Sequence, residues 1–501
     1  MFARVLTRSI VAVALAILAL VGANATAVQT TWIGAEGTNW SLDGNWDNHE
    51  PISSVDAYLN NGNTCVVNQA GEACKYLKLG SDAGATGKVT MESGTLATYS
   101  VSVGTRGSGA LAIRGGGQVS SIGGSLGDFS GSTGTVTVDG ANSKWTSSEA
   151  DLYVGESGSG TLTITNGGEV SSTWSSVGNA AGCTGLVMVE RANSKWTNSS
   201  LTVGNYGSGA LAITSGAQVS SSWRGTIGYQ SGSTGLVTVD GANSKWTDSD
   251  DLTIGTWGSG TLTITGGASV SNTYCILGAA VGSTGSVAVD GANSKWDNSS
   301  ALYVGDRGSG TLTVTNGGEV SSTYSSSVGN AAGSTGSVTV DGVNSKWSSS
   351  SGSSGLYVGD SGSGTLTVKN GGQVFNSNTY LGWNSGSIGI VTVDGTNSRC
   401  TNSSLLMVGR SGAGTLMITG AGHVSSITAN VGYDAGSTGT VTVQGANSEW
   451  TNSLDAGLLS PTTVGVACPV EPTSDLYVAY YGSGTLTIKD GGHVLTDVPP
   501  R

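Results

Sequence analysis

The feature that most constrains the fold is a seven-residue string that returns about every 50 residues. The string D-G-A-N-S-K-W, or a close variant, ends in tryptophan in six copies, and Cys400 takes that place in a further copy. Self-similarity at such a period is typical of propellers, helical arrays and solenoids. The six tryptophans are Trp145, Trp196, Trp246, Trp296, Trp347 and Trp450.

Each copy consists of two related halves, so the structural unit is shorter than the repeat. In both halves an apolar residue and a Gly lead through small residues into an alternating strand and a turn, as in 154–170 and 431–450. These apolar-Gly pairs recur in steps of 23 to 30 residues, and Ala479 marks a sixteenth turn. A coil of this length suits about three short strands joined by tight turns. A four-stranded propeller blade would have no half-period, and helical periodicity is missing from the sequence.

We therefore predict an all-β fold, a parallel β-helix (β-solenoid) of about 16 coils with two coils in each repeat. The right-handed form is expected, because connections between parallel strands are overwhelmingly right-handed.

Alternation inside the strands separates core residues from surface residues. In T-L-T-I-T at 161–165, Leu162 and Ile164 are expected to face inward and the threonines outward. Flat threonine arrays on β-solenoids can bind ice or crystalline polysaccharide, but threonine is also an ordinary exposed strand residue. We therefore keep this role as an alternative. The residues concerned are Thr161, Thr163, Thr165, Thr261, Thr263, Thr311 and Thr313.

The pattern divides the chain into segments. Residues 1–27 are interpreted as a signal peptide, because two arginines precede an apolar run too short to span a bilayer, and small residues follow. Residues 28–75 lack the repeat, and we interpret them as an N-terminal cap over the open end of the solenoid. The β-helix is predicted over 76–498, with a lateral loop inserted at 453–475. We expect the mature chain to be exported, without a transmembrane segment.

Charge and cysteine content narrow the possible partners. The net charge is −13, from 20 Lys plus Arg against 33 Asp plus Glu, and the cations form no cluster. Nucleic acid is therefore not an expected partner. The six cysteines form no regular framework, but Cys65 and Cys74 could close a small disulfide loop.

Catalysis is considered because parallel β-helices host polysaccharide lyases and hydrolases. Such enzymes need clustered carboxylates, often with Ca²⁺. Here the recurring acidic residues would stand about 10 Å apart along one edge, and Asp before Gly is a common choice in turns. We expect no catalytic residue and no cofactor, and no motif supports a Ca²⁺ site. The recurring residues are Asp139, Asp240, Asp290, Asp341 and Asp394.

Units reading G-S-G-T-L-T-I-T-N-G-G-x-V-S-S and G-S-T-G-x-V-T-V-D-G-A-N-S-K-W resemble the repeat of autotransporter passengers and PEP-CTERM-associated surface proteins of Gram-negative bacteria. The opening segment with Trp32, Trp40 and Trp46 also resembles their N-terminal entry segment. The resemblance covers nearly everything from Trp32 to Val494. It implies a β-helical passenger displayed outside the cell, usually without enzymatic activity.

We therefore expect a non-enzymatic, extracellular or cell-surface rod with a structural or adhesin-like role. Its candidate partners are surface polysaccharide and other cell-surface or matrix components. The alternatives are a carbohydrate-active β-helix enzyme and a solenoid that binds ice or polysaccharide through its threonines. No translocating barrel or sorting motif follows the last half-repeat, so the sequence leaves the mode of attachment open.

Overall fold

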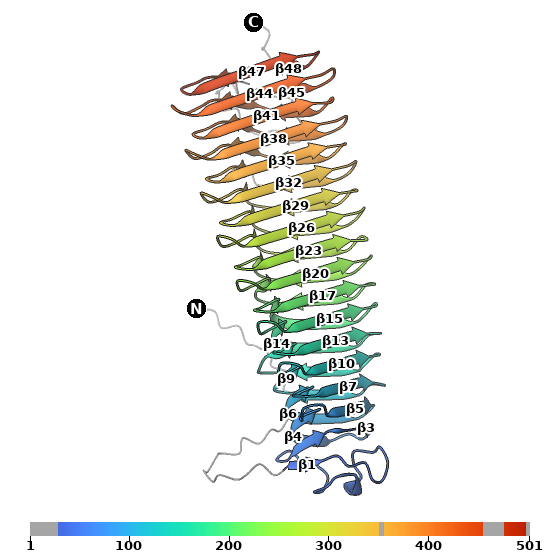
Figure 1. Ribbon diagram of the computed structural model, residues 1–501. Coiled ribbons are helices and arrows are strands. Elements are labelled where there is room, and N and C mark those ends of the chain that lie inside the picture. Colours follow the sequence, from blue (N-terminus) through green and yellow to red (C-terminus); the bar gives the residue numbers. More distant parts are fainter. Residues whose placement is uncertain (1–28, 350–354, 454–474, 497–501) are drawn as a thin grey trace, which may run out of the picture.

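The computed structural model describes residues 29–349, 355–453 and 475–496, which form a long parallel β-solenoid (Figure 1). One sheet receives a single strand from every turn and contains 17 strands, so the solenoid has 17 turns. Helix is limited, within these residues, to the three-residue 3-10 turn η1 (Asp43–Asn45). The near strands in Figure 1 run from left to right while the chain climbs, which is the right-handed sense. The predicted parallel β-helix is confirmed.

Every turn has three walls, and wall 1 is the sheet of 17 strands. Its strands are β3 (Asn61–Val67), β5 (Thr86–Glu92), β7 (Ser108–Arg114), β10 (Thr133–Asp139), β13 (Ser159–Thr165), β15 (Thr184–Glu190), β17 (Ser208–Thr214), β20 (Thr234–Asp240), β23 (Ser259–Thr265), β26 (Thr284–Asp290), β29 (Ser309–Thr315), β32 (Thr335–Asp341), β35 (Ser363–Lys369), β38 (Ile388–Asp394), β41 (Ala413–Thr419), β44 (Thr438–Gln444) and β47 (Ser483–Lys489).

Wall 2 follows wall 1 in each turn and carries the repeated tryptophans. Its separate strands are β8 (Gln118–Ser121), β11 (Lys144–Ser147), β18 (Gln218–Ser221), β21 (Lys245–Asp248), β24 (Ser269–Asn272), β27 (Lys295–Asn298), β30 (Glu319–Ser322), β33 (Lys346–Ser349), β36 (Gln373–Asn376), β39 (Arg399–Asn402), β42 (His423–Ser426), β45 (Glu449–Asn452) and β48 (His493–Thr496).

Wall 3 completes the turn and leads back to wall 1. Its strands are β1 (Gln29–Thr31), β2 (Asp56–Leu59), β9 (Gly123–Leu126), β12 (Leu152–Val154), β19 (Gly225–Ile227), β22 (Leu252–Ile254), β25 (Cys275–Leu277), β28 (Leu302–Val304), β31 (Ser326–Val328), β34 (Gly355–Val358), β37 (Asn378–Leu381), β40 (Leu405–Val408), β43 (Thr428–Val431) and β46 (Leu476–Val478). Four longer strands pass from wall 2 into wall 3: β4 (Glu72–Leu79), β6 (Thr95–Val103), β14 (Glu169–Val177) and β16 (Lys195–Val203).

The core is a set of inward columns in which equivalent residues of successive turns lie in register. On wall 1, Leu162 pairs with Val136 below and Val187 above, and all three are buried. On wall 2, Trp145 lies between Val119 and Val170 and has no exposed surface. Burial of each such aliphatic side chain contributes about 1.5–3 kcal/mol, so the stack is stabilised evenly along its length.

The corner between walls 1 and 2 explains the repeated D-G-A-N-S. Asn243 has a φ of 67°, in the left-handed region that asparagine tolerates better than most residues. The hydroxyl of Ser244 donates to the Asp240 carbonyl at 2.6 Å and accepts the Gly216 N–H at 2.9 Å. The serine therefore closes its own turn and also ties it to the turn below.

The first turn lies inside the segment that we predicted to be a cap. Strands β2 and β3 lie within residues 28–75, and they pair in parallel with β4 and β5 of the following turn. This turn was missed because its residues do not carry the repeated strings, and the count rises from the predicted 16 to 17.

Below the first turn, the three N-terminal tryptophans pack on each other. The Trp46 ring lies edge-on to Trp32 and Trp40, with centroid distances of 5.2 and 4.8 Å, and its Nε1 donates to the Trp40 carbonyl at 2.8 Å. All three side chains are buried. The capping role of this segment stays a prediction.

Two predicted segments fall largely outside the described residues: the signal peptide at 1–27, and the inserted loop at 453–475 apart from its ends at Ser453 and Asp475. Across the described ranges, no helix has the length and apolar character needed to cross a bilayer.

Candidate functional site

The outward threonines predicted from the sequence lie on the outer face of wall 1. Most are half-buried, because neighbouring turns shield them, whereas Thr311 is exposed. They occupy two main columns, of which Thr161 and Thr163 on β13 are typical. The predicted members are Thr161, Thr163 and Thr165 on β13, Thr261 and Thr263 on β23, and Thr311 and Thr313 on β29.

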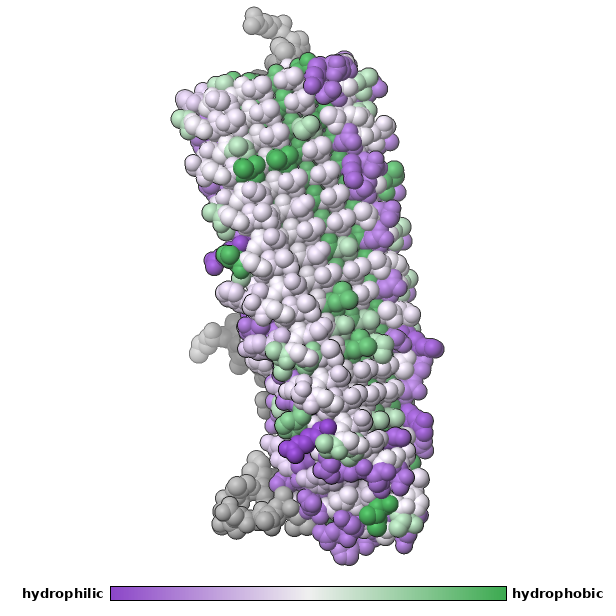
Figure 2. Space-filling view, in the orientation of Figure 1, coloured by the Kyte–Doolittle hydropathy of each residue, from purple (hydrophilic) through white to green (hydrophobic). Residues whose placement is uncertain are grey.

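This threonine array is interrupted. It is most continuous from β29 to β35, where hydroxyl residues fill both columns. Elsewhere apolar side chains stand in the same columns, and Figure 2 shows green residues scattered over the pale face of wall 1. The interrupting residues include Leu186, Met188, Leu236, Ala288, Ile390 and Met417.

A third column of hydroxyl groups, at the start of the wall 1 strands, was not predicted. Here Ser and Thr alternate from turn to turn, and the Thr184 hydroxyl donates to Ser159 at 3.0 Å. The same bond recurs for Thr234 with Ser208, Thr284 with Ser259 and Thr335 with Ser309. The alternation of S-G and T-G at the strand starts was the available sequence signal.

The recurring acidic residues stand at the end of the wall 1 strands and are used in contacts between turns. Oδ1 of Asp290 accepts hydrogen bonds from the Thr315 hydroxyl and from Asn316 Nδ2, both at 2.6 Å. Equivalent bonds link Asp139 to Asn166, Asp240 to Thr265, Asp341 to Asn370 and Asp394 to Thr419. These Asp residues therefore stand where a wall 1 strand ends at a corner, as the sequence predicted, and their side chains bond to the next turn of the solenoid.

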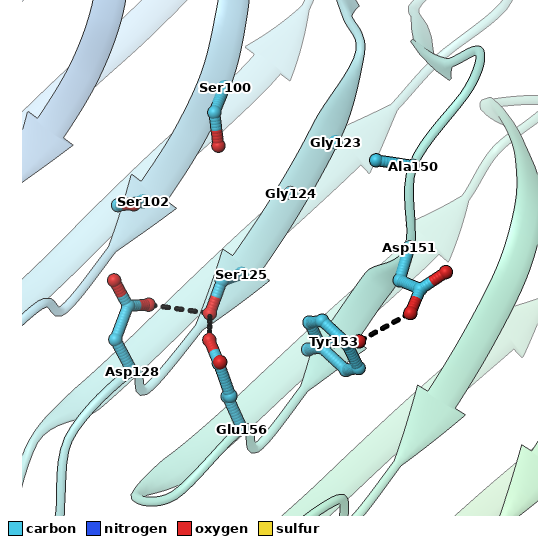
Figure 3. A pocket seen from close by; sticks show the side chains of 10 residues that line it. All are labelled: Ser100, Ser102, Gly123, Gly124, Ser125, Asp128, Ala150, Asp151, Tyr153 and Glu156. Carbon is cyan, nitrogen blue, oxygen red and sulfur yellow. Dashed lines mark hydrogen bonds between the residues drawn. The ribbon is translucent and has the colours of Figure 1, made fainter.

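A polar hollow lies on wall 3, where three consecutive turns meet (Figure 3). Its volume is about 420 Å³. Small residues create it, since Ser100, Gly123 and Ala150 line it where larger side chains stand in other turns. The remaining lining residues are Ser102, Gly124, Ser125, Asp128, Asp151, Tyr153 and Glu156.

Two carboxyl groups meet at one hydroxyl in this hollow. The Ser125 hydroxyl lies 2.6 Å from Oδ1 of Asp128 and also contacts Oε2 of Glu156. A hydroxyl has a single proton to donate, so it can satisfy one carboxylate and not both. Burial raises the pKa of Asp128 to about 6, and repulsion from Glu156 adds to the shift, while hydrogen bonds from Ser125 oppose it. Asp128 therefore keeps its proton to a higher pH than a free aspartic acid does.

The sequence did not single out this hollow. Asp128 and Glu156 each follow the apolar-Gly pair that ends a wall 3 strand, and most other turns have Asn, Thr or an aromatic residue there, although Asp306 and Asp360 occupy the same position. On the opposite side, the Tyr153 hydroxyl donates to Oδ2 of Asp151. Within the described residues, no group of three or more His, Cys, Asp or Glu side chains is arranged to hold a metal ion.

The predicted disulfide is wrong in this structure. Cys65 and Cys74 are both free and buried. The nine-residue spacing places them on strands of different walls, Cys65 on β3 and Cys74 on β4. Burial raises the pKa of both thiols, to about 12 for Cys74, and both pack in the core as small apolar side chains.

A buried polar column on wall 2, next to the tryptophans, was also missed. It contains Ser and Asn side chains that accept from indole N–H groups, as Asn272 does from Trp296 at 2.8 Å. Asp248 is the ionisable member among the described residues of this column, and only 3% of its surface is exposed. Burial raises its pKa to about 7.

No protein-family model matches this chain, and no curated protein matches it. Among solved structures, the crystal structure of a TibC-catalyzed hyper-glycosylated TibA55-350 fragment matches at 14% identity, over 87% of this chain and 100% of that chain, with a TM-score of 0.33. A TM-score this low identifies neither a family nor a function, so the resemblance to autotransporter passengers and PEP-CTERM-associated proteins stays a prediction.

Proposed function

We propose that this chain is a non-enzymatic structural or adhesive rod, exported and acting outside the cell or at its surface. The observation that carries the proposal is that polar groups repeat along the walls at equivalent positions of successive turns. The Asp290 carboxylate, for example, binds Thr315 and Asn316 of the next turn, and four other repeats use the same arrangement. Such a surface suits distributed contacts, as in other solenoids.

Export is supported by the sequence of residues 1–27, which has the order of charged, apolar and small residues found in signal peptides. The acidic net charge of −13 and the lack of a cationic cluster fit an extracellular surface protein better than one that binds nucleic acid.

The test has two parts, both with the purified full-length chain. Beads coated with the protein are measured for adhesion to bacterial cells and to immobilised surface polysaccharide, with albumin-coated beads as control. The same protein is incubated with neutral and acidic polysaccharides, with and without Ca²⁺, and chain cleavage is followed. We expect saturable adhesion and no turnover. Absence of adhesion to every surface, or clear turnover, would refute the proposal.

A carbohydrate-active enzyme is the second candidate, and the hollow on wall 3 is the observation that favours it. Asp128 with its raised pKa can hold a proton beside the carboxylate of Glu156, as general acid–base catalysis requires. Turnover of any polysaccharide that is abolished in both Asp128→Asn and Glu156→Gln would establish this activity. Turnover that survives both substitutions would locate the activity elsewhere.

Ice or crystalline polysaccharide binding through wall 1 is supported only where the hydroxyl columns are continuous, from β29 to β35. Thermal hysteresis of the purified chain tests the ice-binding form. If a signal is present, Thr339→Leu should reduce it, whereas Thr137→Leu, far down the same column, should not. Absence of hysteresis would eliminate ice binding.

A further inference from the structure

Aromatic side chains are segregated to one side of the rod. All 15 tyrosines of the chain fall within the described residues, and each occupies an outward position of wall 3 or one of its two corners. The tryptophans outside the core follow the same rule: Trp174, Trp223, Trp257 and Trp383. The outer faces of walls 1 and 2 have no tyrosine or tryptophan in the described ranges, and Phe375 is the aromatic residue on wall 2.

Stacking of the turns does not explain this segregation. Walls 1 and 2 stack in the same parallel register without tyrosine or tryptophan outside, as between β29 and β32 and between β30 and β33. Some wall 3 rings do pack along the axis, and Tyr357 and Tyr380 are stacked at 4.9 Å. Other rings are left open to water: the exposed fraction is 52% for both Trp174 and Trp223, and 57% for Trp257. Exposed aromatic groups gathered on one face are typical of a binding surface.

A continuous row of small polar residues runs between the aromatic residues at the two corners of wall 3. Ser176, Thr202, Thr226 and Thr253 lie on successive turns, each in register with the next. Trp174 and Trp223 stand on one side of this row, with ring centroids 5.8 Å apart. The corner leading to wall 1 provides the other side, with the exposed rings of Tyr206, Tyr229 and Trp257.

The hollow described above is the lower end of the same row. Tyr153 pairs with Ser125 below and with Ser176 above, so the pocket and the row share one column. Above the hollow, the Asn179 side chain accepts hydrogen bonds from Ser176 and from Asn205. The result is a face of hydroxyl, amide and carboxyl groups with aromatic rings at both edges, from β9 to β22.

The charge of this face restricts its ligand. Asp128, Asp151 and Glu156 line the hollow, and Asp251 lies farther up, against a single arginine, Arg224, at the adjacent corner. Carboxylates accept hydrogen bonds from neutral hydroxyl groups but repel anionic polymers.

We propose that wall 3, from β9 to β22, binds an uncharged polysaccharide whose chain lies along the rod axis. The inference rests on the adhesive role proposed above and names its ligand class and its face. Successive turns are about 4.8 Å apart, close to the length of one pyranose unit in an extended glycan. Each sugar therefore meets one turn, with polar groups of the row bonding its hydroxyls and the flanking rings packing on its apolar faces.

The experiment measures retention of the full-length chain on insoluble neutral polysaccharides, namely cellulose, β-1,3-glucan and mannan, and in gels containing polygalacturonate. We expect retention on at least one neutral polymer and none with polygalacturonate. Trp174→Ala combined with Trp223→Ala should weaken retention about tenfold or more, because each removes a packing surface. Trp257→Ala is an independent variant on the opposite edge and should weaken it as well.

Phe375→Ala is the matched control, since it removes an aromatic side chain from the outer face of wall 2. It should leave retention unchanged, and circular dichroism should show that all variants remain folded. Three outcomes would overturn the proposal: no retention on any neutral polymer, retention that wall 3 variants leave unchanged, or retention on polygalacturonate alone.

Failure here is distinguishable from failure of the adhesive role. If coated beads still adhere to cells while glycan retention is absent, the rod is an adhesin with another ligand, and only the assignment of wall 3 falls. If adhesion is also absent, the proposed function itself fails.

Discussion

The indole ring of Trp145 fills the space that a side chain at Gly124 would need. A Cβ atom added to Gly124 would overlap Cζ2 of the ring and lie 2.9 Å from Cη2. Trp145 belongs to the turn whose wall 3 strand carries Leu152, and Gly124 pairs with Leu152 from the turn below. The large residue of one turn is therefore accommodated by a missing side chain in its neighbour.

This large–small alternation continues along the rod. Turns with a core tryptophan carry Leu at the first inward position of wall 3, and the turns between them carry smaller residues there. The smaller residues, in order, are Gly124, Ser175, Gly225, Cys275, Ser326, Thr379 and Ala429.

Gly124→Ala is expected to destabilise the rod by about 1–3 kcal/mol, because the added methyl group overpacks the core against the Trp145 ring. Trp145→Leu should also destabilise it, by loss of buried area and a cavity. In the double variant the two losses should be less than additive, because the smaller side chain leaves room for the methyl group. Chemical denaturation followed by circular dichroism measures all three; additive losses would show that the two residues do not compete for space.

Cys400 is the exception to this large–small alternation, and it provides a second test of the alternation. It takes the tryptophan position, and the facing residue is Thr379, whose hydroxyl donates to Asn402 Oδ1 at 2.5 Å. Cys400→Trp alone is expected to lower the melting temperature by overpacking. Cys400→Trp combined with Thr379→Gly should recover most of the loss. A single variant that melts at or above the temperature of the parent would contradict this explanation.

The buried carboxyl of Asp248 should make stability depend on pH. Burial raises its pKa to about 7, with repulsion from Asp250 and Asp251 adding to the shift, while hydrogen bonds from the backbone N–H groups of Asp250 and Gly225 oppose it. The buried Cys275 thiol of the next turn faces the same region. An unfolded aspartate titrates near pH 3.9, so between about pH 4 and 7 the folded chain holds a proton that the unfolded chain has lost. Stability therefore falls as pH rises through this window.

Asp248→Asn should remove that dependence, since Asn is the residue that other turns place in the column, as at Asn298. We expect equal stability of parent and variant at pH 4, and at pH 8 an advantage for the variant on the order of 1–4 kcal/mol. Asn298→Asp, the reverse change, should create the same pH dependence in a different turn. A parent protein with a flat profile across this range would contradict the assignment.

The described cysteines should be unreactive in the folded protein. Burial raises the pKa of the Cys65, Cys74 and Cys400 thiols, and the thiolate is the nucleophile. In a Cys468→Ser background, iodoacetamide should therefore label none of the remaining five at pH 8 until denaturant is added. Reductant should leave the melting temperature unchanged. Detection of a cross-linked peptide containing Cys65 and Cys74 would show that the disulfide suggested by the sequence does form.

The sequence by itself determined the fold class and the faces of the strands. Parallel strands of one length repeat in register, so apolar alternation in Thr161–Thr165 was enough to assign core and surface. The first turn, with β2 and β3, was not predicted, because its side chains meet the same steric demands without the repeated strings. The packing of Trp145 against Gly124 was not predicted either, since the spacing along the chain does not show which residues face each other across turns.

Only the tertiary structure decided where polar and aromatic groups gather. Residues such as Asp128 and Glu156 are one turn apart in sequence, and it is the coiling that brings both to the hydroxyl of Ser125. Tyrosines scattered through the sequence become one face because each turn returns the chain to the same wall. Likewise, Cys65 and Cys74 are close in sequence but lie on different walls, because the corner between them turns the chain.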